Sequence, residues 1–347
     1  MSENEQAIDT REEIERFKKD FYDISDEIGK KIVGHKDILE MVLIAFFADG
    51  HVLLEGVPGL GKTLLVKSLS KALGFDFNRI QFTPDLMPAD IIGTQIVVEK
   101  AEGRKDFEFS AGPVFANIVL ADEINRATPK TQSAMLEAME ERQVTIAGKT
   151  HKLRSPFFVL ATQNPIEMEG TYTLPEAQVD RFLFKLNLAF PSFNELKDIL
   201  RQTTANENYT ISPVFEAKEA LSRVTEMRKL VRDVLVSSRV EDYITNIILN
   251  THPNNNKTGN PKPGNDDITE YVKRNVTYGS SPRGAQAMML AAKAMALLDS
   301  RANVSYEDVN KVAVAALNHR ILLNFEAEAD SIKSQSIIEN ILVKLRR

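Results

Sequence analysis

Eight residues decide the fold of this chain, and their sequence is Gly56-Val57-Pro58-Gly59-Leu60-Gly61-Lys62-Thr63. They fit the pattern G-x-x-x-x-G-K-[ST], between an expected strand at His51–Leu54 and an expected helix from Leu64 onward. In that context the glycines let successive backbone N–H groups curl around phosphate oxygens, and the helix N-terminus adds partial positive charge. Lys62 can then reach the β- and γ-phosphates, and Thr63 can bind Mg²⁺. We therefore predict that this loop binds a nucleoside triphosphate.

Apolar runs alternate with helical stretches on both sides of the loop. The runs are typical of strands buried on both faces of a parallel sheet. They lie at His51–Leu54, Phe77–Phe82, Ile118–Ala121, Phe157–Thr162 and Phe182–Leu186. Helices are expected at Asp37–Asp49, Leu64–Leu73 and Pro129–Glu141. Strands that alternate with helices predict a doubly wound α/β domain.

Two segments interrupt this alternation and predict short β-hairpins inserted into the α/β frame. Their strands and turn glycines are Gln95–Val98, Gly103 and Phe107–Phe109, then Val144–Ile146, Gly148 and Lys152–Leu153. From the residues alone, both are ordinary surface hairpins.

The two ends of the chain are expected to be helical. Five apolar residues mark one face of an N-terminal helix: Ile14, Phe17, Phe21, Ile24 and Ile28. Later helices are expected at Leu196–Arg201, Phe215–Leu235, Val240–Leu249, Arg283–Leu298, Ser305–Leu323 and Ile332–Leu345. Between them, Pro253–Gly279 is rich in Asn, Pro, Gly and Lys and predicts a long polar loop. We expect an N-terminal helix (1–30), an α/β core (31–191) and an all-helical domain (192–347).

Composition excludes several classes of function. Hydrophobic residues make up 43% and charged residues 27% of the chain, the balance of a soluble globular protein. The net charge of -6 gives no general attraction to nucleic acid or to an anionic membrane. There are no cysteines, which excludes thiolate metal sites, and the histidines lack ligand spacing. With no secretory signal and no apolar run near the roughly 20 residues of a membrane span, we expect a cytoplasmic protein.

Polar side chains end two of the expected strands. Asp122 and Glu123 follow the run Ile118–Ala121, where the carboxyl end of a buried strand meets the ligand crevice of an open α/β sheet. Asp122 can hold the Mg²⁺ shell there, and Glu123 can activate a water molecule as a base. Asn164 ends the next run, and its amide can touch the γ-phosphate or orient that water.

Two arginines complete the set of candidate catalytic residues. Arg181 precedes the last expected strand, and Arg283 lies at the start of a later helix. Arginines stabilise the charge that spreads over the γ-phosphoryl oxygens during phosphoryl transfer. An exposed arginine more often makes a solvated ion pair. Sequence spacing leaves both readings open.

The motifs, and their order along the chain, resemble those of the AAA+ ATPases and, within them, the MoxR family. The resemblance covers about residues 32–325 and is most specific in Gly56–Thr63, Ala121–Ala127, Ala161–Pro165 and Thr173–Phe182. It implies a P-loop AAA+ core followed by a helical lid.

The resemblance implies roles for the strand-end residues. Lys62 and Thr63 are similar to the Walker A pair, which binds the nucleotide phosphates and Mg²⁺. Asp122 and Glu123 are similar to the Walker B pair of metal ligand and base. Asn164 is similar to sensor 1.

Further residues gain roles by the same resemblance. Arg181 is similar to the arginine finger, which completes the site of a neighbouring subunit, and Arg283 to sensor 2. Val33 and Gly34 are similar to the loop that lines the adenine pocket. Arg126 matches a family position and implies either a subunit contact or a catalytic role.

The resemblance also implies assembly and partners. The two hairpins are similar to inserts that line or border the central channel of a ring in the clade of magnesium chelatase and the minichromosome maintenance helicases. A homo-hexamer is implied, which hydrolyses ATP with Mg²⁺ and remodels or matures proteins that bear von Willebrand factor A domains.

Two other functions compete with protein remodelling. A nucleic-acid motor is favoured by Lys149, His151, Lys152 and Arg154 in the second hairpin. The net charge and the lack of interleaved aromatic residues count against it. A scaffold that binds nucleotide without turnover is the third hypothesis, but every catalytic position holds a competent residue.

Overall fold

The computed structural model describes residues 3–100, 104–165, 171–204, 209–253 and 266–345. The chain divides into two compact units. The core unit comprises Tyr22–Arg181 and Leu186–Thr225, and the lid unit comprises Met1–Phe21, Phe182–Lys185 and Glu226–Arg347. Neither unit is one continuous piece of sequence.

A five-stranded sheet with the order β2-β5-β8-β1-β9 forms the centre of the α/β fold. Its strands are β1 (Val52–Glu55), β2 (Phe77–Gln81), β5 (Ile118–Asp122), β8 (Phe158–Gln163) and β9 (Phe184–Asn187). The pairings β2–β5, β5–β8 and β8–β1 are all parallel. The carboxyl ends of these four strands therefore meet along one edge, and the predicted doubly wound α/β fold is confirmed.

Burial follows the position of each strand in the sheet. The central strands β5 and β8 are buried up to their last residue, as expected for strands covered on both faces. Strand β2 lies at an edge of the sheet, where Ile80 is buried but Asn78 and Arg79 are exposed. The prediction that Phe77–Phe82 is buried on both faces is therefore wrong, because Asn78 and Arg79 point to opposite faces of the sheet and both are exposed.

Helices connect the strands. Those of the core unit are α2 (Lys36–Phe47), α3 (Lys62–Leu73), α4 (Pro88–Ile92), α5 (Pro129–Glu141), α6 (Glu176–Val179) and α7 (Phe193–Thr204). Helix α5 has the predicted bounds: Pro129 suits the first helical turn, and Arg142 ends the helix with a left-handed φ of 52°. Helix α2 stops at Phe47, two residues before the predicted end.

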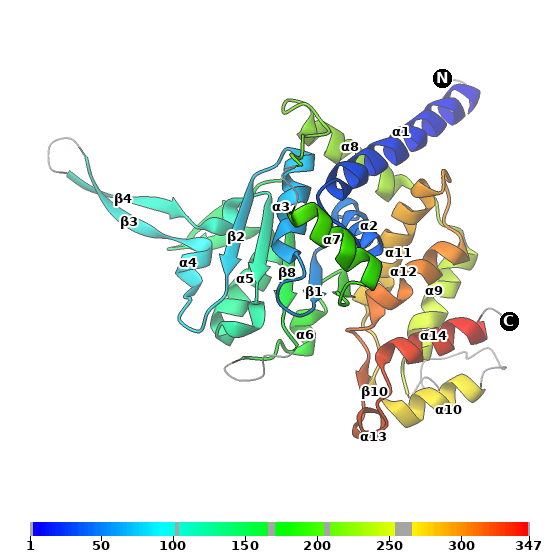
Figure 1. Ribbon diagram of the computed structural model, residues 1–347. Helices are drawn as coiled ribbons and strands as arrows, with labels where there is room; N and C mark the ends of the chain where they lie inside the picture. Colours follow the sequence, from blue (N-terminus) through cyan, green and yellow to red (C-terminus); the bar gives the residue numbers. More distant parts are fainter. Residues whose placement is uncertain (1–2, 101–103, 166–170, 205–208, 254–265, 346–347) are drawn as a thin grey trace. The chain divides into compact units, whose positions relative to one another are not determined.

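Both predicted hairpins are present in the core unit. Strands β3 (Gly93–Lys100) and β4 (Arg104–Ala111) pair antiparallel, as do β6 (Gln143–Ile146) and β7 (Lys149–Lys152). Figure 1 shows that the β3–β4 hairpin projects beyond the other strands of this unit. The predicted turn at Gly103 lies outside the described residues. The imidazole of His151 stacks on the Phe109 ring with centroids 4.0 Å apart, which ties the two hairpins together.

The lid unit is mainly helical. Its elements are α9 (Ser238–Asn250), α10 (Asp266–Asn275), β10 (Val276–Tyr278), α11 (Pro282–Leu298), α12 (Tyr306–Leu317), β11 (Leu322–Leu323), α13 (Phe325–Ala329) and α14 (Ser334–Leu345). Helices α1 (Glu3–Gly29) and α8 (Ala220–Asp233) contribute residues to both units. The five apolar residues predicted to mark one face of α1 are all buried.

Two predictions for the lid unit are wrong in detail. The predicted polar loop Pro253–Gly279 contains helix α10 and strand β10, while its residues 254–265 lie outside the described residues. The helix predicted for Ser305–Leu323 ends at Leu317, and β11 follows it and pairs with β10. The composition of 266–278 is polar, but Val272 and Val276 are buried and anchor this segment in the unit.

Among the described residues, none of the helices combines the length and the apolar character that crossing a lipid bilayer requires.

Candidate nucleotide-binding site

The glycine-rich loop connects β1 to α3, as predicted. Gly59 and Gly61 adopt left-handed φ values of 85° and 78°, which glycine tolerates at little cost. A Cβ atom added at either glycine would meet no heavy atom within 4 Å, so the space beside the loop is open. Helix α3 begins at Lys62, and its first N–H groups have no acceptor within the helix. The loop therefore has the shape and polarity of an anion cradle.

Lys62 folds back over the strand ends. Its ammonium group donates hydrogen bonds to the carbonyl oxygens of Gly56 and Gln163, the latter at 3.4 Å. Gln163 ends β8, which pairs with β1 in register. Lys62 thus links the loop to the edge of the sheet where the polar strand-end residues lie.

Asp122 is held from two sides. On one side, Thr162 Oγ1 donates to Asp122 Oδ1 at 2.6 Å. On the other, Arg79 donates from Nε and Nη2 to Asp122 Oδ2, at 3.0 and 2.8 Å. The carboxylate therefore has one oxygen fixed by a neutral hydroxyl group and one oxygen bound by a cation.

Glu123 has a constrained backbone. Its φ of 57° lies in the left-handed region, which costs a non-glycine residue about 1–2 kcal/mol. Its N–H donates to Thr162 Oγ1 at 2.8 Å, which holds this conformation. The carboxylate oxygen Oε2 accepts from Gln81 Nε2 at 2.7 Å and from Arg126 Nη1 at 2.9 Å. Backbone conformations of this kind concentrate at functional sites.

The strand-end residues fit Mg²⁺ and a nucleotide. Asp122 supplies carboxylate oxygens, the ligands that Mg²⁺ prefers, and its Oδ2 is bound by the cation Arg79. Asn164 is 5% exposed and follows β8 directly, next to Gln163 and its contact with Lys62. Thr63 is half-buried in the first turn of α3. The structure thus brings the predicted Lys62, Asp122, Glu123 and Asn164 to one edge of the sheet.

The segment predicted to line the adenine pocket connects α1 and α2. Val33 is half-buried, and Gly34 has a φ of 76°. A Cβ at Gly34 would lie 2.6 Å from Oε1 of Glu195 in α7, which would have to move, and the positive φ strains any other residue at this position. Hydrogen bonds from the side chain and backbone of Ser192 lower the pKa of Glu195 and keep it ionised. The adenine-binding role of this segment stays a prediction.

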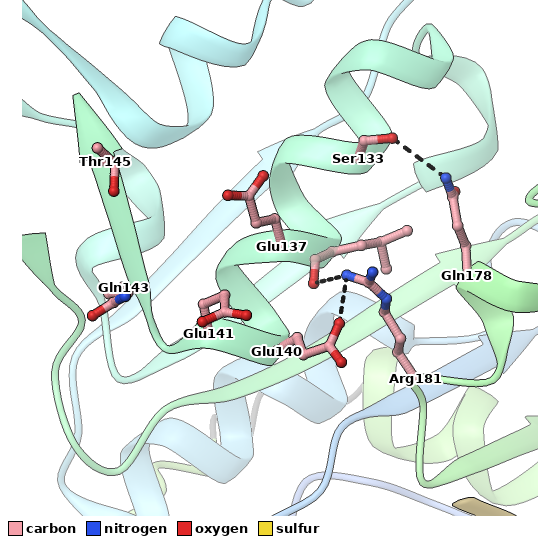
Figure 2. A pocket seen from close by; sticks show the side chains of 9 residues that line it. Ser133, Glu137, Glu140, Glu141, Gln143, Thr145, Gln178 and Arg181 are labelled. Carbon is pink, nitrogen blue, oxygen red and sulfur yellow. Dashed lines mark hydrogen bonds and ion pairs between the residues drawn. The ribbon is translucent and has the colours of Figure 1, made fainter. Parts of the chain in front are cut away.

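Arg181 lines a hollow of about 400 Å³ beside α5. Its Nη1 donates to the carbonyl oxygen of Leu136 at 2.9 Å and pairs with Glu140 at 3.0 Å (Figure 2). Glu137, Glu141 and Gln178 also line this hollow. The side chain of Arg181 therefore binds helix α5 of the same chain, and its role as an arginine finger stays a prediction.

Arg283 is exposed at the start of α11 in the lid unit. Its backbone N–H donates to the capping Ser281 Oγ at 3.2 Å. The sensor 2 role stays a prediction. Arg126, for which the sequence left two roles open, contacts Glu123 within the same chain.

Sequence reasoning missed Arg79, Gln81 and Thr162. All three belong to strands next to β5, and the parallel register places Gln81 and Thr162 opposite or beside Asp122. For β2, the sequence signal that could have found them is the alternation of polar and apolar residues. Arg79 and Gln81 flank the buried Ile80, and this spacing places both polar side chains on the same face of the strand.

A glycine loop that opens a helix, in the same parallel sheet as a strand that leads into two adjacent carboxylates, defines a P-loop nucleotide-binding protein. Comparison with known proteins agrees. Residues 51–184 match the family "ATPase family associated with various cellular activities (AAA)", and residues 268–341 match the AAA lid domain.

Proteins with similar sequences and structures identify the family within the AAA ATPases. Chaperone MoxR1 of Mycobacterium tuberculosis is 42% identical over 91% of this chain and 79% of its own length. YeaC of Bacillus subtilis is 44% identical over 91% of both chains. A crystal structure of a protein from Cytophaga hutchinsonii superimposes with a TM-score of 0.85 at 41% identity, covering 98% of both chains. This chain belongs to the MoxR family of AAA+ ATPases.

Proposed function

We propose that this protein hydrolyses ATP with Mg²⁺ and uses the energy to remodel or mature partner proteins. The observation that carries the proposal is the convergence of Lys62, Asp122, Glu123 and Asn164 on one edge of the sheet. Phosphoryl transfer depends mainly on positioning and on stabilising charge, and these residues provide both.

Each residue has a distinct task in this proposal. The loop N–H groups and Lys62 bind the phosphates, while Thr63 and Asp122 hold Mg²⁺. Bound Mg²⁺ neutralises the charge on the phosphate oxygens as the bond to the leaving group breaks. Glu123, fixed by Gln81 and Arg126, accepts a proton from the attacking water. Asn164 orients that water or the γ-phosphate.

The remaining candidate residues are proposed to connect the nucleotide with the lid and with a neighbouring subunit. Arg181 of a neighbouring copy completes each site as an arginine finger, and Arg283 responds from the lid. Val33 and Gly34 line the adenine pocket. The proposed assembly is a homo-hexamer in the cytoplasm. The proposed domains of each chain are the N-terminal helix (1–30), the core (31–191) and the lid (192–347).

Proteins with von Willebrand factor A domains are the partners proposed. The name of the mycobacterial relative, Chaperone MoxR1, supports a protein partner. A Glu123→Gln variant tests this, because its amide cannot accept the proton and ATP stays bound. With ATP, this variant should retain a purified von Willebrand factor A domain protein from the same genome, and with ADP it should not. Lys62→Ala is the control that cannot load ATP.

Two results would contradict the proposal. Equal retention of the partner with ATP, ADP and the Lys62→Ala control would remove the link between nucleotide and partner. Phosphate release that DNA stimulates, with a steep dependence on salt, would favour a nucleic-acid motor instead.

A further inference from the structure

Arg79 is an exposed residue with a specific contact in the candidate site. It lies on the edge strand β2, and its side chain is 47% exposed, whereas that of Asp122 is 13% exposed. Two of its N–H groups converge on the single oxygen Oδ2 of Asp122. A surface arginine without a structural role would be solvated, whereas Arg79 directs two donors at one half-buried oxygen.

The geometry leaves little room for a second cation on this oxygen. A carboxylate oxygen offers about two lone-pair directions, and Arg79 Nε and Nη2 use both on Oδ2. The other oxygen, Oδ1, accepts from Thr162 Oγ1, which is itself held by the N–H of Glu123. A metal ion at Oδ2 has to displace Arg79, and a metal ion at Oδ1 would share the carboxylate with the guanidinium, so that the two positive charges would repel each other.

We propose that Arg79 is the counter-ion of Asp122 in the metal-free protein and that Mg²⁺ displaces it. The inference rests on the proposed function, since it assumes that Asp122 binds the metal of a bound nucleotide. Arg79 is a positioning residue: it holds the carboxylate of Asp122 in place, and it sets how much Mg²⁺ the site needs.

The contacts of Arg79 also connect metal binding to the catalytic base. Its Nη2 donates to Gln81 Oε1 at 2.5 Å, and Gln81 Nε2 donates to Glu123 Oε2 at 2.7 Å. When Arg79 leaves Asp122, Gln81 loses a donor and can turn. The arrival of the metal at Asp122 thereby changes what holds Glu123, through side chains on one edge strand.

The test measures how the binding of a fluorescent nucleotide, mant-ADP, depends on Mg²⁺ concentration. Arg79→Ala removes the competitor, so half-maximal binding should need about threefold to fivefold less Mg²⁺, the factor expected for a partly exposed ion pair. With EDTA in place of Mg²⁺, the variant and the wild type should bind mant-ADP equally. Arg79→Lys keeps the charge without the fork and should lie between them.

Arg154→Ala is the matched control. Arg154 also pairs with an aspartate of the core unit, Asp76, but both side chains are exposed and neither is among the residues proposed to bind the nucleotide or Mg²⁺. Its Mg²⁺ dependence should equal that of the wild type. A second readout is thermal unfolding: Arg79→Ala should gain more stability from Mg²⁺ and ADP than the wild type gains.

The outcomes separate the inference from the proposed function. A higher Mg²⁺ requirement in Arg79→Ala, or one equal to the Arg154→Ala control, would overturn the role of Arg79 while nucleotide binding stands. Wild-type protein that fails to bind mant-ADP with Mg²⁺ would overturn the proposed function and this inference with it.

Discussion

Buried polar residues show how single side chains stabilise the lid unit. Arg320 and His319 follow the end of α12 and are 7% and 9% exposed. Arg320 Nη2 donates to the carbonyl oxygen of Phe182 at 2.7 Å, and Nη1 donates to that of Leu183 at 3.2 Å. Nε2 of His319 lies 3.1 Å from the Phe182 carbonyl and has to donate to it. Both side chains thus bind the backbone of Phe182–Lys185 directly after the end of α12.

His319 gives a pH prediction. Burial, and then the charges of Arg320 and Lys185, lower the pKa of His319 well below its ordinary value. The folded protein therefore keeps His319 neutral, while the unfolded chain binds a proton near the usual pKa of about 6.5. This contribution to stability is fully present above about pH 6.5. It is lost as the pH falls toward the folded pKa, by at most about 1.4 kcal/mol per pH unit.

Urea unfolding between pH 7.5 and pH 5.5 measures this effect. His319→Gln retains an N–H donor for the Phe182 carbonyl but has no group that titrates in this range. The free energy of unfolding of the variant should therefore fall less steeply with decreasing pH than that of the wild type. Equal slopes would show that His319 does not titrate as inferred.

At the scale of elements, helix α5 fixes the position of the Arg181 side chain. The ion pair with Glu140 and the bond to the Leu136 carbonyl hold this arginine on the helix of its own chain. If Arg181 is the finger of a neighbouring site, Arg181→Ala should lower ATP turnover about 10³–10⁵-fold, the value of such a finger in related enzymes. Phosphate release measures this. Arg201→Ala, which removes an exposed ion pair with Asp198, should leave turnover unchanged.

A mixing experiment tests whether Arg181 acts between chains. Arg181→Ala has an intact loop, and Lys62→Ala has an intact arginine. Mixed assemblies should therefore contain some complete sites and recover part of the activity that each variant lacks. Wild-type turnover in Arg181→Ala would remove the finger assignment, and failure to recover activity in mixed assemblies would place Arg181 in its own site.

Elements with local signals were predictable from the sequence. The loop Gly56–Thr63 and helix α5 carry their glycines, proline and apolar spacing within one short segment, so their positions were predicted well. Helix α10 was missed because its polar sequence gains stability from burial of residues such as Val272, which composition does not reveal. Arg79 and Gln81 were missed because their contacts with Asp122 and Glu123 depend on the register between strands distant in sequence.

At the scale of the whole molecule, the division of the chain does not follow sequence order. Phe182–Lys185 groups with the lid unit, although Arg181 before it and Leu186 after it belong to the core unit. Within the lid unit, Arg320 and His319 bind this short segment. A four-residue segment that changes unit is invisible in the sequence, because its membership depends on contacts with residues more than a hundred positions away.

The central claim is that the loop, β5 and β8 form one site for ATP and Mg²⁺. Calorimetric titration of ATP in the presence of Mg²⁺ tests it most directly. The wild type should bind, and Lys62→Ala should bind about tenfold to a hundredfold more weakly, because it loses a charge-assisted bond to phosphate. Lys67→Ala, at an exposed position of the same helix, should bind like the wild type. Absence of binding by the wild type, or equal affinity in Lys62→Ala, would contradict the account.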